Sequence, residues 1–174
     1  MIARAAALAL SLLVGACAIT PSSQPLPQLS AVPASFEMSG RLALRMGQRS
    51  EIAKLRWTHS RDRDTWVIAS PLGNEVARID ADATSATLTQ ADGSGVQADS
   101  FADLTERVLG VALEPMQLAA WLHGATPSND QGWTVTLDEK QPAGAVEIAR
   151  RVSATRGETT VRLVVDEYRA LGSP

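Results

Sequence analysis

The chain is poor in several residue types that mark common kinds of functional site. Cys17 is the only cysteine among its 174 residues, so no disulfide can form within the chain. His59 and His123 are the only histidines, and with one cysteine they are too few for a Cys/His zinc site. With 16 basic and 19 acidic residues, the chain also lacks the basic excess of nucleic-acid-binding proteins. We therefore expect no metal, no cofactor and no nucleic-acid partner.

Sequence motifs of common enzymes are absent as well. Residues 93–95 lack the spacing of a G-x-S-x-G nucleophile elbow, and neither histidine belongs to an H-E-x-x-H motif. No glycine-rich phosphate loop precedes a helix. Asp62 and Asp64 alternate with two arginines, which is typical of a solvated hairpin tip rather than of a catalytic carboxylate pair. The sequence predicts a protein that is not an enzyme, although a triad of residues distant in sequence stays open.

The N-terminal apolar run is too short for a transmembrane helix, which takes about 20 residues. It extends from Ala5 to Ala16 after a basic start and ends in small residues, as in a secretory signal peptide. Cys17 follows Val14-Gly15-Ala16 directly, and this arrangement resembles a bacterial lipobox. The resemblance implies removal of residues 1–16 and acylation of the Cys17 sulfur and amino group. The alternative is a chance cysteine beside an ordinary cleavage site.

Cleavage would leave a mature chain large enough for one domain. It would have 158 residues, 15 of them basic and 19 acidic, for a net charge of −4. Residues 17–35 contain four prolines and predict an extended tether, so we expect the domain to span residues 36–174. More than one acyl chain on Cys17 would hold the protein firmly at a membrane. Residue 18 is alanine, not the aspartate that commonly retains enterobacterial lipoproteins in the inner membrane, which favours the outer membrane.

Apolar and polar residues alternate along most of the domain, which predicts strands with one buried face. In the first strand, the even positions from 36 to 46 are apolar apart from Gly40. Two helices interrupt the strands. Asp99 or Ser100 caps the first, which ends at Gly110, and the second runs from Pro115 to a stop at Gly124. We expect Phe101, Leu104, Val108 and Leu109 on the apolar face of the first helix.

The order of these elements predicts a mainly β fold. Strands are expected near residues 36–46, 53–57, 65–69, 75–79, 84–90, 132–137, 145–152 and 159–166. The helical pair lies between two blocks of strands. We therefore expect one continuous antiparallel sheet with the helices on its concave side.

Several short motifs occur in one order along these elements. They are Ser39-Gly40-Arg41-Leu42-Ala43, Trp57, Ser70-Pro71-Leu72-Gly73, Ala91-Asp92-Gly93, Leu109-Gly110, Pro115 and Leu118-Ala119-Ala120-Trp121-Leu122-His123-Gly124. Together they resemble the LolB family of outer-membrane lipoprotein receptors, from Cys17 to about Tyr168. Ser70 replaces the asparagine of several members, and the segment from Thr126 to Gln131 is short.

The resemblance implies an incomplete antiparallel β-barrel of the LolA/LolB type, with helices that cover an apolar cavity. It also implies a receptor that accepts the acyl chains of client lipoproteins from the periplasmic carrier LolA and releases them into outer-membrane lipid without nucleotide. We expect a monomer, anchored through Cys17 at the periplasmic face of that membrane. The candidate cavity residues are Leu42, Leu44, Leu55, Trp57, Ile68, Leu88, Phe101, Trp121 and Leu163.

The loop formed by Pro71, Leu72 and Gly73 is the second candidate site. Proline and glycine predict a turn between two strands, so Leu72 should project from the loop tip. The alternative is that Leu72 folds back onto its own sheet. In the family, the corresponding leucine is associated with delivery of cargo to the membrane, and the resemblance implies that role here.

Tryptophan is the one abundant aromatic residue, with four copies against two Phe and one Tyr. Trp57, Trp66 and Trp133 fall in strand patterns and Trp121 in the second helix. They could line an apolar site or simply pack in the core. Two other kinds of protein also stay open. One is a structural or assembly lipoprotein that binds a protein partner without a lipid cavity, and the other is a surface-associated hydrolase.

Overall fold

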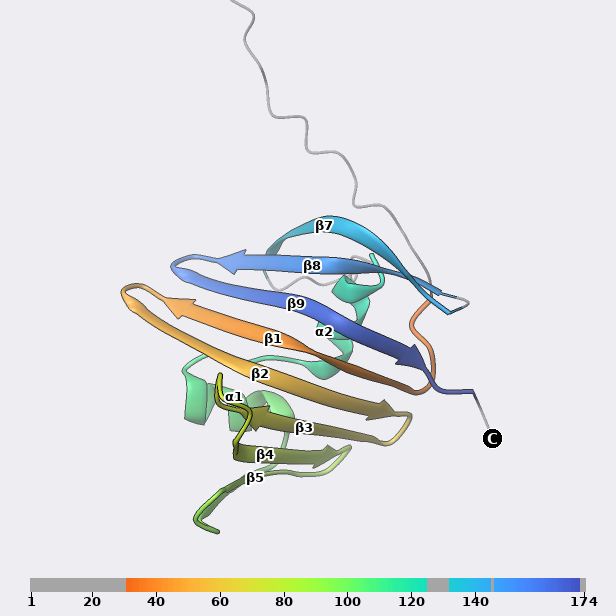
Figure 1. Ribbon diagram of the computed structural model, residues 1–174. Helices are drawn as coiled ribbons and strands as arrows, with labels where there is room; N and C mark the ends of the chain where they lie inside the picture. Colours follow the sequence, from red (N-terminus) through yellow and green to blue (C-terminus); the bar gives the residue numbers. More distant parts are fainter. Residues whose placement is uncertain (1–30, 125–131, 145, 173–174) are drawn as a thin grey trace, which may run out of the picture.

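The computed structural model describes residues 31–124, 132–144 and 146–172. The signal segment 1–16, Cys17, most of the tether and residues 126–131 therefore lie outside the described residues. Within the described ranges the chain forms one nine-stranded antiparallel sheet and two helices (Figure 1). No helix in these ranges is long and apolar enough to cross a membrane.

The strands are ordered β6-β5-β4-β3-β2-β1-β9-β8-β7 in the sheet. The first and last strands, β1 and β9, are thus paired at its middle, while β6 and β7 form two edges that do not pair with each other. The sheet is an open, incomplete barrel of the expected mainly β class. Its elements are β1 (Phe36–Met46), β2 (Arg49–Ser60), β3 (Arg63–Ala69), β4 (Glu75–Asp82), β5 (Ala86–Gln90), β6 (Gly95–Ala98), α1 (Phe101–Leu109), α2 (Pro115–Leu122), β7 (Thr134–Ala143), β8 (Val146–Arg156) and β9 (Thr159–Ala170).

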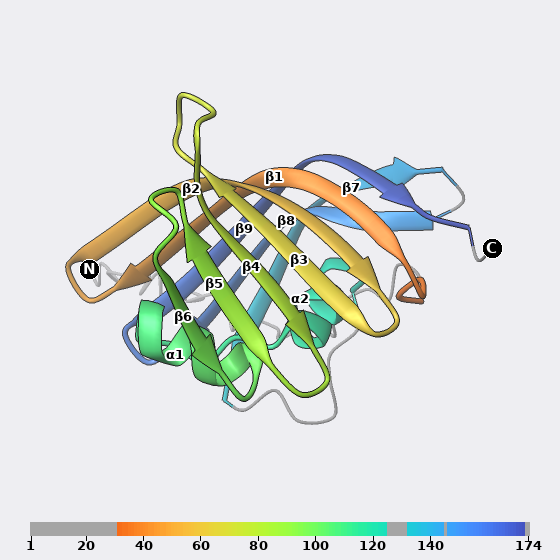
Figure 2. The same ribbon diagram turned by 90° about the horizontal axis from the view of Figure 1, so that it is seen from below.

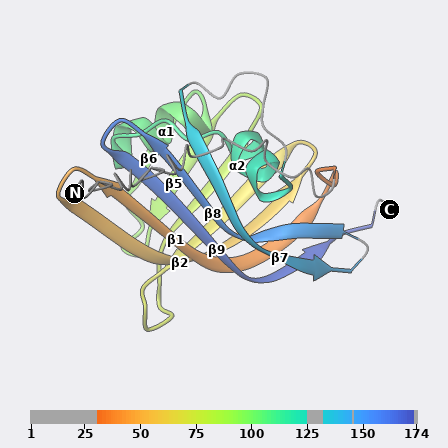
Figure 3. The same cartoon turned by 90° about the horizontal axis from the view of Figure 1, so that it is seen from above.

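Both helices cover the concave face of the curved sheet (Figures 2 and 3). Helix α1 contacts β5 and β6, whereas α2 contacts β7 and β8. The alternation expected in β1 is confirmed, because Phe36, Met38 and Leu44 are buried and Arg41 and Arg45 are exposed. The buried faces of the strands and the helices enclose one apolar core.

The helix ends follow the sequence signals. The Ser100 hydroxyl accepts a hydrogen bond from the Asp103 N–H at 3.0 Å, so Ser100 rather than Asp99 caps α1. Gly110 ends α1 with a φ of 76°, which favours glycine. The expected position of Val108 is wrong, because its side chain is 43% exposed. Thr105 is buried in its place, and its hydroxyl accepts from the Leu113 N–H at 2.9 Å.

Candidate functional site

The expected cavity residues all belong to the apolar core between the sheet and the helices. Leu42 and Ile68 are half-buried against this core, and the other seven are buried. They come from β1, β2, β3, β5, β9 and both helices, so the fold brings together positions more than 100 residues apart. The expected cavity residues did not include Leu104, Leu113 and Ile148, which are among the largest fully buried side chains in the described ranges.

All four tryptophans lie in this core and are at most 3% exposed. The Trp57 ring centroid is 5.5 Å from that of Trp66, and the Trp66 centroid is 4.8 Å from that of Phe101 at the start of α1. Trp121 on α2 and Trp133, which directly precedes β7, form a second pair at 5.5 Å. The Trp57 Nε1–H donates to Asp64 Oδ1 at 2.6 Å. Among the described residues, Trp66, Trp121 and Trp133 have no acceptor for their indole N–H.

Asp64 corrects the prediction of a fully solvated hairpin tip. Of the two aspartates at the β2–β3 turn only Asp62 is exposed, whereas the Asp64 side chain is 14% exposed and accepts from Trp57. Its Oδ1 also lies 2.9 Å from Nδ1 of His59, which is buried. The signal was present in the alternation of β3, because Asp64, Trp66 and Ile68 share one face. The carboxylate is therefore part of the core and holds two neighbouring rings.

His123 forms a second buried polar contact at the end of α2. Its Nδ1 lies 2.8 Å from the Ala119 carbonyl oxygen, and its Nε2 lies 3.0 Å from the Tyr168 hydroxyl oxygen. Burial lowers the pKa of His123, with a smaller contribution from His59, and burial also raises the pKa of Tyr168. The neutral ring therefore donates from Nδ1 to the carbonyl and accepts a hydrogen bond from the Tyr168 O–H at Nε2. This bond ties α2 to the last strand.

The β3–β4 loop carries the most exposed large apolar side chain in the described ranges. Leu72 is 90% exposed, so the alternative in which it folds back onto the sheet is wrong. The loop is closed by hydrogen bonds from the Ser70 N–H to the Asn74 oxygen and from the Gly73 N–H to the Ser70 oxygen, both 2.8 Å. Gly73 has a φ of 98°, which an L side chain rarely adopts. The loop projects from the convex side, away from the helices (Figures 2 and 3).

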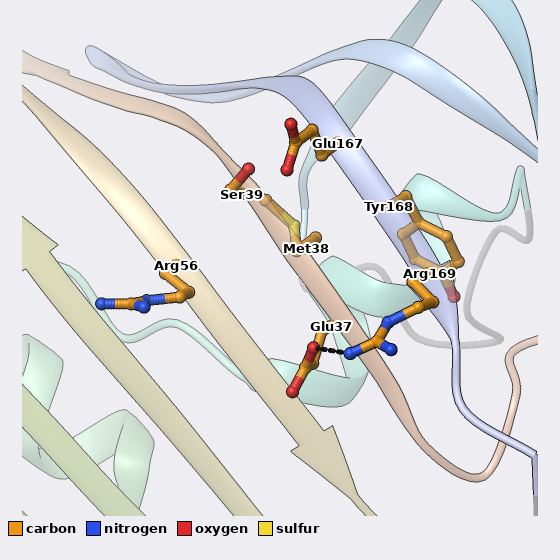
Figure 4. A pocket seen from close by; sticks show the side chains of 7 residues that line it. All are labelled: Glu37, Met38, Ser39, Arg56, Glu167, Tyr168 and Arg169. Carbon is orange, nitrogen blue, oxygen red and sulfur yellow. Dashed lines mark hydrogen bonds and ion pairs between the residues drawn. The ribbon is translucent and has the colours of Figure 1, made fainter.

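The hollows on the convex face have charged side chains in their walls and differ in this respect from the core. One of about 400 Å³ lies over β1, β2 and β9 (Figure 4). The carboxylate of Glu37 and the guanidinium of Arg169 cross it with an ion pair of 2.6 Å, while Arg56 and Glu167 lie at its sides. Charged walls of this kind suit solvent and ions rather than an alkyl chain. The apolar core and the Leu72 loop therefore remain the two candidate sites.

A further hollow of about 310 Å³ lies beside the N-terminal ends of both helices. Its walls include Phe101, Pro115 and Met116 together with the Glu114 carboxyl. Burial raises the pKa of Glu114, and the nearby charge of Asp103 adds to the shift. This end of the helical layer thus combines apolar side chains with a carboxyl group of raised pKa and with charged side chains of the β2–β3 turn.

Comparisons with known proteins show which family the chain resembles. Residues 34–168 match the family described as "Outer membrane lipoprotein LolB". The outer-membrane lipoprotein LolB of Chromobacterium violaceum is 33% identical over 97% of this chain and 99% of its own. That of Azoarcus sp. (strain BH72) is 29% identical over 91% of each chain. A looser likeness, with a TM-score of 0.45 and 7% identity, covers 84% of this chain and 90% of a LolA superfamily protein from Nitrosomonas europaea. The chain belongs to the LolB family of outer-membrane lipoproteins.

Proposed function

We propose that this protein is a receptor that takes client lipoproteins by their acyl chains from a LolA-type periplasmic carrier and inserts them into the outer membrane. As a LolB-family protein, it serves in lipoprotein localisation at the outer membrane. The finer features are our proposal: a lipid anchor on Cys17, at the periplasmic face of that membrane, and a monomeric, non-enzymatic mode of action. The proposed transfer needs no nucleotide.

The observation that supports this proposal most strongly is the continuous apolar core beneath the two helices. No strand in the described ranges closes the sheet on the side where the helices lie. Because β6 and β7 do not pair, α1 and α2 span the open side of the sheet. An outward shift of the helices would admit an alkyl chain between them and the seven candidate residues on the strands. Each CH₂ group removed from water contributes about 0.8 kcal/mol, so a chain of about 16 carbons can be held by burial alone.

The Leu72 loop supports the second half of the proposal, which is release at the membrane. An exposed leucine at the tip of a projecting loop is suited to insertion among lipid head groups and upper acyl chains. The loop lies on the opposite face from the helices, so lipid contact there leaves the helical layer free to move (Figure 3).

The test separates uptake from release. Leu72→Glu is expected to accept an acylated client normally but to transfer it to outer-membrane vesicles at least about tenfold more slowly, because a carboxylate is costly to insert among lipids. Ile52→Glu is the matched control, since Ile52 is also an exposed aliphatic residue (63%) but lies on β2, outside the loop. If Leu72→Glu inserts clients at the parental rate, the proposed role of the loop is wrong.

The alternative function is a structural or assembly lipoprotein that binds a protein partner. Such a protein would form no complex with a lipopeptide. Native mass spectrometry of the anchorless domain with a lipidated client distinguishes the two. A complex that loses its client to added vesicles supports the receptor, and absence of any complex contradicts it.

A further inference from the structure

The four buried tryptophans differ in one chemical respect. Trp57 donates its indole N–H to Asp64, but the N–H groups of Trp66, Trp121 and Trp133 have no acceptor among the described residues. A buried donor without an acceptor is unfavourable and uncommon in folded proteins. Three such donors in one apolar core therefore call for an explanation beyond packing.

The other polar groups of the core already have partners, and the one further buried side-chain atom without a partner among the described residues, the Ser70 hydroxyl, lies in the β3–β4 loop. The Thr105 hydroxyl bonds to backbone groups, Asp64 accepts from two rings, and His123 bonds to Ala119 and Tyr168. What the core leaves available is therefore a set of hydrogen-bond donors. A matching ligand would be largely apolar and would offer uncharged acceptors.

The three free donors lie at two places under the helical layer. Trp66 contacts Phe101 at the beginning of α1, whereas Trp121 and Trp133 contact each other at α2. The Arg156 guanidinium lies 4.6 Å from the Trp133 ring centre and helps to fix that ring. Rigid aromatic rings in fixed orientations are suited to recognising a polar group at a defined position.

We propose that the indole N–H groups of Trp66, Trp121 and Trp133 donate hydrogen bonds to the carbonyl oxygens that link acyl chains to the cargo. An ester carbonyl accepts hydrogen bonds, carries no charge and stands at the head of an alkyl chain, so it matches both the free donors and the apolar surroundings. This inference rests on the proposed function, because it requires acyl chains in the core. It adds that the receptor recognises the acyl linkage as well as the chain.

The experiment compares two lipopeptides that differ only in this linkage. One is a cysteine peptide whose S-glyceryl group has two palmitoyl esters, and the other has two hexadecyl ethers. Displacement of a fluorescent alkyl probe from the anchorless protein gives both affinities. The parent is expected to prefer the ester by about three- to tenfold, the usual size of a hydrogen-bond contribution. Trp66→Phe, Trp121→Phe and Trp133→Phe are each expected to lower this ratio.

Two controls separate hydrogen bonding from loss of packing. Trp57→Phe removes an equally buried indole of the candidate cavity whose N–H is already bonded, so it should weaken ester and ether binding alike and leave their ratio equal to that of the parent. Replacement of each of the other three by benzothienylalanine keeps the ring size and removes only the N–H. A lowered ratio in these isosteres supports the proposal even where the phenylalanine variants fold poorly.

The outcomes that overturn the inference are distinct from failure of the receptor function. If both lipopeptides bind with equal affinity, or if the ratio survives in all three phenylalanine variants and isosteres, the hydrogen bonds are absent while the receptor function stands. If neither lipopeptide displaces the probe, the proposed function fails and the inference fails with it. The same displacement assay is run with two phospholipids, diacyl and dialkyl phosphatidylethanolamine. If the ester is preferred only in this phospholipid pair and not in the lipopeptide pair, the assignment to lipoprotein cargo is contradicted.

Discussion

Asp64→Ala is expected to destabilise the domain by about 2–6 kcal/mol, although the residue lies beside a surface turn. The substitution removes the common acceptor of two buried donors, Trp57 Nε1 at 2.6 Å and His59 Nδ1 at 2.9 Å. Each buried donor left without an acceptor costs about 1–3 kcal/mol, and two together give the stated range. A domain of this size loses about 4 °C in melting temperature per kcal/mol, so we expect a decrease of about 8–24 °C.

The neighbouring Asp62 provides a matched control for this change. It is exposed at the tip of the same turn, and Asp62→Ala should change the free energy of unfolding by no more than about 0.5 kcal/mol. Asp64→Asn keeps an acceptor oxygen, so its free energy of unfolding should lie between those of the two alanine variants. The measurement is urea unfolding of the anchorless domain followed by circular dichroism. Equal midpoints for Asp64→Ala and Asp62→Ala would refute the role assigned to the buried carboxylate.

The free energy of unfolding should decrease as the pH falls below 6.5, the ordinary pKa of histidine, because burial lowers the pKa of His123 and the unfolded chain binds the proton first. Urea titrations between about pH 7.5 and 5 should show a smaller slope in His123→Phe. Gly40→Ala should lower the free energy of unfolding by about 1–3 kcal/mol or more, since a Cβ there would lie 2.1 Å from the Val164 carbonyl oxygen. Gly172→Ala, which meets no atom within 4 Å, should unfold like the parent. Cys17→Ala should bind a client lipopeptide with unchanged affinity, and loss of binding would mean that anchor and core do not act independently.

The strand pattern could be predicted because one face of the sheet is buried along nearly its whole length. Period-two alternation placed β1, β2 and β9 with the correct faces, and Ser100, Gly110 and Pro115 marked the helix ends. These signals are local, because the face of a strand or the end of a helix is indicated by residues that are neighbours in the sequence. The single continuous sheet followed from the position of the helical pair between two blocks of strands, but the pairing of β1 with β9 was not predicted.

The errors have physical causes that a linear pattern does not contain. Strand β6 was missed because Gly95–Ala98 is too short to show alternation, and it forms only by pairing with β5. Thr105 takes the buried place expected for Val108, because its hydroxyl finds backbone partners in the core. The alternation of aspartates with arginines predicted a solvated tip, and it outweighed the period of β3, which places Asp64 on the inner face with Trp66 and within reach of the Trp57 N–H.

The position of Leu72 could be predicted because proline and glycine determine a turn without help from the rest of the fold. The indole donors could not be distinguished from the sequence. Four tryptophans look alike until the structure shows that Asp64 reaches only Trp57. Which polar atoms remain without partners depends on packing across β3, α2 and β7 together.

The pairing of β1 with β9 has a consequence for how the exported chain folds. Strands β1 to β6 each pair with the next along the chain, so this half can form as a series of local hairpins. The central seam joins Met46 to Thr159 and Phe36 to Ala170, and it must wait for the C-terminus. Such distant contacts close late and slowly. Until then the eleven-residue β1 presents an open edge to its surroundings, so the last strand to arrive protects the chain against aggregation.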